Sequence, residues 1–126
     1  MVAPNGNWVA AVDTTRRVVL YQAKPGPPHP TTIVLESGEA LIRVTQDGQG
    51  IYVNRWMEPD GAAALPARVY RVDFATGTRR FAMNLAPTDP AGVSTVALPY
   101  LTPDHRGYVF HYIRILSDLF LVEGLR

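Results

Sequence analysis

The chain has 126 residues, enough for one ordinary domain, and 47% of them are hydrophobic. Twelve basic and eleven acidic residues leave a formal net charge of +1, which argues against nucleic acid or an anionic membrane surface as a partner. Cysteine is absent, which excludes disulfides and thiolate metal sites, and no apolar run approaches the roughly 20 residues of a membrane-spanning helix.

The N-terminal third of the chain predicts three short β-strands. Residues 8–13 and 17–22 are rich in Val and Ala, and the short break between them favours a hairpin. The segment KPGPP at residues 24–28 then interrupts strand pairing, because proline has no N–H to donate. A β-branched run at residues 31–35 is expected to form the third strand.

The rest of the chain predicts further strands and no helix. Residues 41–44 and 51–56 flank a turn, and residues 68–73 alternate polar with apolar side chains, which is typical of a half-buried strand. The chain then turns and returns as a strand at residues 79–85. Three more strands are expected toward the C-terminus, at residues 93–98, 108–112 and 119–122. We therefore expect an all-β fold.

One turn phrase occurs three times along the chain. Its copies are APNGNW at residues 3–8, TQDGQG at residues 45–50 and TPDHRG at residues 102–107, each followed by a β-branched or aromatic run. Asn or Asp accepts a backbone hydrogen bond in such a turn, and Gly takes a positive φ. We expect Gly48 to need a positive φ. In the third copy, His105 stands at the position of this glycine. Self-similarity of this kind indicates a repeat architecture.

The spacing of the copies fits propeller blades of about 40–50 residues each. Two insertions rich in Pro, Gly and Asp, at residues 58–66 and 86–92, lengthen the later units. We therefore predict a partial β-propeller over residues 1–126, with about two and a half to three blades of four-stranded antiparallel sheet. Its units are approximately residues 1–37, 38–91 and 92–126, with strands b-c-d, a-b-c-d and a-b-c.

Two motifs resemble a known family. TPDHRGYVF at residues 102–110 resembles the SPDGxxIAF phrase of TolB-like, WD40-like (PD40) propeller repeats, and LSDLFLVEG at residues 116–124 is similar to the SDLYLVEG ending of bacterial TolB-like propellers. The resemblance is uneven, since Ala3 and Thr45 replace the usual Ser, Gln46 replaces Pro and His105 replaces Gly. It implies a bacterial propeller of the kind that often forms the C-terminal part of serine/threonine protein kinases.

The sequence predicts no catalytic site, cofactor or metal. It lacks the glycine-rich phosphate loop and the HRD and DFG motifs of a kinase, and no GxSxG elbow supports a Ser-His-Asp triad. His29, His105 and His111 have no second ligand at metal-binding spacing. The aspartates near strand ends are expected to hydrogen-bond turn backbone instead: Asp13, Asp47, Asp73, Asp104 and Asp118.

The two insertions define a candidate binding face. Both are b–c or d–a connections, which emerge at the same end of antiparallel blades, and long loops on a rigid scaffold commonly carry binding residues. The candidate binding residues are Arg55, Trp56, Asp60, Asp89 and Arg114. Trp56 has two open interpretations, since large aromatics favour interfaces but also pack between blades.

Three functions are consistent with these features. The first is a non-catalytic propeller segment for protein–protein interaction or ligand sensing. The second is a non-catalytic propeller portion of a larger enzyme, either a bacterial serine/threonine kinase or a propeller-gated peptidase. The third is a propeller fragment that closes by self-association. Since rings need about four to eight blades, unpaired edges predict a homo-oligomer, most simply a dimer. We expect a soluble protein in the bacterial cytoplasm or periplasm, with its partner or ligand unidentified.

Overall fold

The computed structural model describes residues 6–102, 104, 106–119 and 121–124. Residues 3–5 of the first turn phrase, together with His105 and Phe120, lie outside this part. The described chain contains no helix, which confirms the all-β class. Its strands are β1 (Trp8–Val12), β2 (Arg17–Gln22), β3 (His29–Val34), β4 (Glu39–Val44), β5 (Gly50–Met57), β6 (Ala63–Asp73), β7 (Arg79–Leu85), β8 (Val93–Leu101) and β9 (Tyr108–Arg114).

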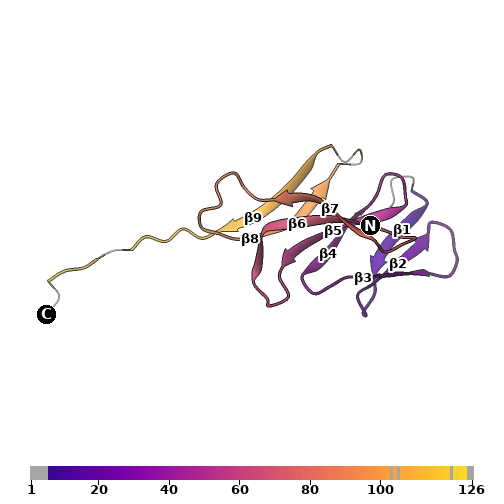
Figure 1. Cartoon of the computed structure of the whole chain (residues 1–126), viewed down its shortest axis with the longest axis horizontal. Coiled ribbons are helices and arrows are strands. Elements are labelled where there is room, and N and C mark those ends of the chain that lie inside the picture. The colour runs from indigo at the N-terminus through magenta and orange to yellow at the C-terminus, as the bar shows by residue number, and fades with distance from the viewer. Residues whose placement is uncertain (1–5, 103, 105, 120, 125–126) are drawn as a thin grey trace.

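The strands form three antiparallel sheets in chain order (Figure 1). The first sheet has the order β1-β2-β3, the second β4-β5-β6-β7 and the third β8-β9. The middle sheet lies between the other two, and residues 115–119 and 121–124 run away from all three. The first and middle sheets have the three and four strands expected of their units, whereas the third sheet has two of the three expected strands in the described part of the chain.

The middle sheet has a hydrophobic core on each face. One cluster joins it to the first sheet and includes Val18, Ile33, Val44, Ile51, Val53 and Val72. The other joins it to β8 and includes Ile42, Ala67, Val69, Leu85, Val93 and Val96. Because alternate side chains of a strand point to opposite faces, a sheet covered on both sides needs apolar residues at successive positions. This requirement explains the run Gly50-Ile51-Tyr52-Val53 in β5.

The repeated turn phrase has the same hydrogen bonds in its second and third copies. Thr45 N–H donates to Gly50 O over 2.9 Å, and Gly50 N–H donates to Thr45 Oγ1 over 3.0 Å. Thr102 and Gly107 make the same two bonds, both over 2.9 Å. In each copy the threonine hydroxyl also donates to the aspartate at the third position, over 2.5 Å. The turn phrase is therefore repeated in its hydrogen bonds as well as in its sequence.

The turns that lead into β4 and β8 also match. Trp56 N–H donates to Gly38 O over 3.0 Å, and Ile115 N–H donates to Gly92 O over 2.8 Å. Both glycines have positive φ, 79° and 72°, and a Cβ at either position would clash with the carbonyl oxygen of Met57 or of Ile115. The hairpins β4–β5 and β8–β9 are thus anchored alike at both ends. Arg55 and Arg114, opposite Glu39 and Val93, are equivalent residues.

Aspartate side chains organise the turns, as expected. Asp13, Asp47, Asp73 and Asp104 each accept a hydrogen bond from the backbone N–H two residues later, over 2.8 to 3.1 Å. Asp60 and Asp89 do the same within the two loops, both over 3.0 Å. Asp118 lies in an exposed segment outside the strands.

The structure corrects two expectations about strand boundaries. Leu119, Leu121 and Val122 are not in a strand but in an exposed extended segment, so the third sheet has two strands in the described chain. A strand there would pair with β9 but would have no further layer to bury its leucines, and a small sheet without such cover is only marginally stable. The insertion at residues 58–66 is also shorter than expected, because β6 begins at Ala63 and pairs it with Met57.

Replacing Gly48 should destabilise the fold because of its backbone conformation, not because of a steric clash. Its φ is 71°, and a Cβ there would meet nothing within 4 Å, so a substitution causes backbone strain without a steric clash. Gly48→Val should lower the free energy of unfolding by about 1–2 kcal/mol in urea titrations. Gly26, which lacks a positive φ and has only ordinary contacts, is the matched control. Equal effects of Gly48→Val and Gly26→Val would contradict this account.

Asp47 should make stability depend on acid pH. The Arg71 guanidinium, followed by the Thr45 hydroxyl and the Gln49 N–H, holds the pKa of the Asp47 carboxyl below its ordinary value. The carboxylate therefore stabilises the fold fully above the unfolded pKa of about 3.9, and this contribution is lost as the pH falls toward the folded value. Asp47→Asn should be less stable than wild type at pH 7, with a smaller difference below about pH 4. Asp118→Asn is the control, and a pH-independent difference would refute the linkage.

Candidate functional site

A buried carboxylate lies at the end of the middle sheet where β4 begins. The Glu39 side chain is 0% exposed, and its Oε1 accepts hydrogen bonds from Arg55, over 3.2 Å, and from Arg79. Its Oε2 accepts the N–H of Glu36 over 2.9 Å. Arg55 also pairs with the exposed carboxylate of Glu36. Two cations and one N–H therefore compensate the burial of this charge, as buried carboxylates require.

Arg16 connects the β1–β2 turn to the same place. Its φ is 64°, and its guanidinium donates to three carbonyls, those of Leu35, Glu36 and Glu39, over 3.1, 2.7 and 2.8 Å. A residue with positive φ that is not glycine is unusual, and here the strain coincides with three bonds to the chain between β3 and β4. All three arginines, Arg16, Arg55 and Arg79, thus bind protein groups. Arg16 and Arg79 connect the first sheet to the second, since Arg79 also donates to Val34 O of β3 over 3.3 Å.

Two of the other predicted binding residues, Arg114 and Asp89, are paired with each other. Arg114 donates to the backbone carbonyl of Asp89 over 2.5 Å, and the two side chains form an ion pair at 3.5 Å. This pair repeats the Arg55–Glu36 contact of the preceding hairpin. Asp60 accepts the N–H of Ala62 inside its own turn. The arginines at the strand ends are therefore engaged in holding the loops, and only Trp56 faces an open cavity.

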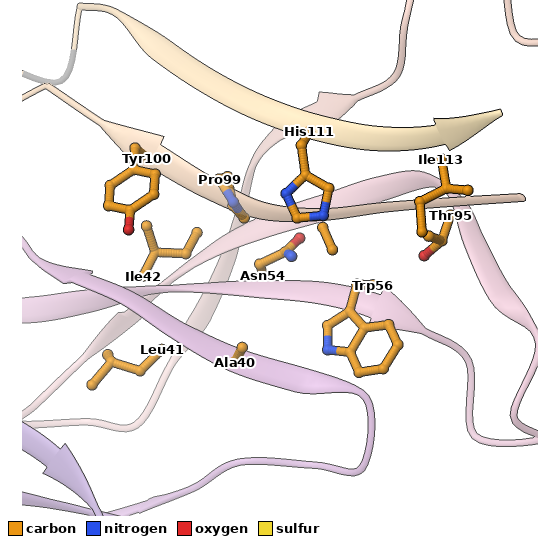
Figure 2. A pocket seen from close by; sticks show the side chains of 11 residues that line it. Ala40, Leu41, Ile42, Asn54, Trp56, Thr95, Pro99, Tyr100, His111 and Ile113 are labelled. Atoms are coloured by element: carbon orange, nitrogen blue, oxygen red, sulfur yellow. The ribbon is translucent and has the colours of Figure 1, made fainter. Parts of the chain in front are cut away.

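That cavity is a cleft of about 420 Å³ between the middle and third sheets (Figure 2). Its lower wall in Figure 2 comes from β4 and β5, with Ile42, Asn54 and Trp56, and its upper wall from β8 and β9. The remaining lining residues are Ala40, Leu41, Thr95, Ala97, Pro99, Tyr100, His111 and Ile113. Mainly apolar clefts of this size with few polar groups are typical small-molecule sites.

Asn54 is the deepest polar side chain of the cleft. The residue is 1% exposed, and neither Oδ1 nor Nδ2 has a hydrogen-bond partner among the described residues. In Figure 2 the amide points into the space between the walls, with Trp56 beside it and His111 on the opposite wall. A buried amide without partners destabilises a fold by about 1–3 kcal/mol. The other buried polar side chains of the core, Glu39 and Thr45, are bonded.

Sequence reasoning found Trp56 but missed Asn54. The available signal was the period of β5, in which Tyr52, Asn54 and Trp56 share one face and Asn54 alone is neither aromatic nor apolar. His111 was predicted to be an ordinary strand histidine. It lines the cleft because β8 and β9 lie against the middle sheet, and this tertiary packing has no local sequence signal.

Among the described residues, no group of three or more His, Asp or Glu side chains is arranged to hold a metal ion. No helix of that same part of the chain is long and apolar enough to cross a membrane. Comparisons with protein-family models, curated protein sequences and solved structures gave no match.

Glu39 should contribute far more to stability than Glu36, although both contact Arg55. Glu39→Gln leaves Arg55 and Arg79 without their buried carboxylate, and removing one partner from a buried pair destabilises by about 3 kcal/mol or more. Glu36→Gln removes an exposed partner and should change stability by about 0–1 kcal/mol. Urea unfolding of both variants tests this, and similar losses would show that the buried cluster has no special role.

Proposed function

We propose that the chain is a non-catalytic β-propeller repeat segment that acts in protein–protein interaction and associates with a second copy of itself. The repeat of hairpins β4–β5 and β8–β9, with matching turns at both ends, supports the propeller assignment. Successive sheets stacked face against face along the chain are what such a fold requires. We infer a second copy as the partner because β9 of the third sheet has an edge that no described strand pairs with.

The open edge of β9 is the observation that carries this proposal. In the middle sheet β5 pairs with β4 on one side and β6 on the other. The equivalent strand β9 pairs with β8, and no described strand lies on its other side. Unpaired edges recruit strands from other chains, because their backbone N–H and C=O groups are available for a ladder.

The segment after β9 offers a suitable strand. Its apolar side chains Ile115, Leu116, Leu119, Leu121 and Val122 are exposed, Leu119 to 98%. Ile115 N–H donates to Gly92 O, which directs the chain onward past the hairpin, and Figure 1 shows residues 115–119 and 121–124 leading away from the sheets. A segment that leads away from its own β9 reaches the β9 of another copy more readily. Burying each leucine there would contribute about 1.5–3 kcal/mol.

Substitutions in this segment should abolish association. We expect wild type to sediment as a dimer at equilibrium, and the Leu119→Asp/Leu121→Asp double variant to sediment as a monomer, because a carboxylate on the strand cannot be buried without a partner. Leu65→Asp, at an exposed leucine of β6, should leave the dimer intact. A wild-type monomer at the highest soluble concentration, or a double variant that still dimerises, would refute the proposal.

A further inference from the structure

The amide of Asn54 contributes no hydrogen bond to the described fold, although the residue is only 1% exposed. It lines the cleft on the wall of the middle sheet, opposite the wall formed by β8 and β9. The asparagine adds one donor group and one acceptor that the protein leaves without partners.

The surroundings of this amide define what would bind it. Trp56, Ile42 and Tyr100 offer a largely apolar lining, which favours a flat apolar body. The donor and acceptor of Asn54 lie side by side and match a group that presents N–H next to C=O, since the two amides can then exchange two hydrogen bonds. No charged side chain lines the cleft, so a neutral ligand is favoured over an ion.

From this juxtaposition we infer that the cleft between the middle and third sheets is a binding site for a small planar molecule with a primary carboxamide or lactam edge. Asn54 is the specificity-determining residue, and Trp56 packs against the apolar body. The volume of about 420 Å³ suits a small molecule of this class. This site lies between the sheets, and the inference does not depend on association through β9.

Two probes of nearly the same shape test the inference in the full chain. Benzamide has a planar ring and a primary carboxamide, whereas methyl benzoate keeps the ring and the carbonyl but has no N–H. Titration followed by nitrogen-15 NMR should show benzamide shifting the Asn54 side-chain amide and the Trp56 indole signals. Benzamide should bind at least about ten-fold more tightly than methyl benzoate. Equal affinities, or no shift at saturating benzamide, would overturn the inference without any variant.

A variant then assigns the preference to Asn54. Asn54→Leu is nearly isosteric and should weaken benzamide by about ten-fold while changing methyl benzoate by less than about three-fold. Its thermal unfolding should be no less cooperative than that of wild type, because the substitution removes a buried amide without hydrogen-bond partners. Asn84→Leu, at an exposed asparagine of β7, is the matched control and should leave both affinities unchanged. Unchanged benzamide binding in Asn54→Leu would overturn the assignment.

Discussion

The buried carboxylate of Glu39 is the interaction on which the arrangement of the sheets depends. It lies at the start of β4, so the ion pairs with Arg55 and Arg79 connect β4 to β5 and β7 of the same sheet. Arg16 reaches the adjacent carbonyls from the first sheet. Burying a charge is costly unless its partners are present, so the carboxylate holds the ends of β4, β5 and β7 together. The bonds from Arg16 to Glu39 O and from Arg79 to Val34 O add polar contacts between the first two sheets.

The third sheet has no equivalent of this cluster among the described residues. Val93 stands where the middle sheet has Glu39, and Arg114 pairs with the exposed Asp89 at 3.5 Å. Arg43 donates to Leu101 O over 3.0 Å, and apolar contacts of β8 complete the attachment. The hairpin is therefore held on one side, which leaves the cleft and the edge of β9 open. The first two sheets are thus joined by polar and apolar contacts, whereas the third sheet has an open cleft beside it and an unpaired edge at β9 in the described chain.

The sequence predicted the elements whose signals are local. Period-two alternation at residues 68–73 located the C-terminal half of β6, and the turn after it placed β7. The Asp and Gly of the turn phrase predicted the positive φ of Gly48. The strand expected at residues 119–122 was wrong because apolar sequence specifies a preference for burial but not the layer that provides it. Asn54 and the Glu39 cluster escaped prediction because both depend on which sheets meet. Arg55 was chosen as a ligand-binding residue, whereas the structure engages it with two glutamates.

Amide hydrogen exchange at several protein concentrations tests this account most directly. Amides of β5 and β6, which are covered on both faces, should exchange most slowly and at rates independent of concentration. Amides of β9 and of residues 115–124 should exchange quickly in dilute solution and become protected as the concentration rises and the open edge is filled. Protection of β9 that stays constant over the whole concentration range, or slowest exchange in β8 and β9, would contradict a rigid middle sheet beside an open third one.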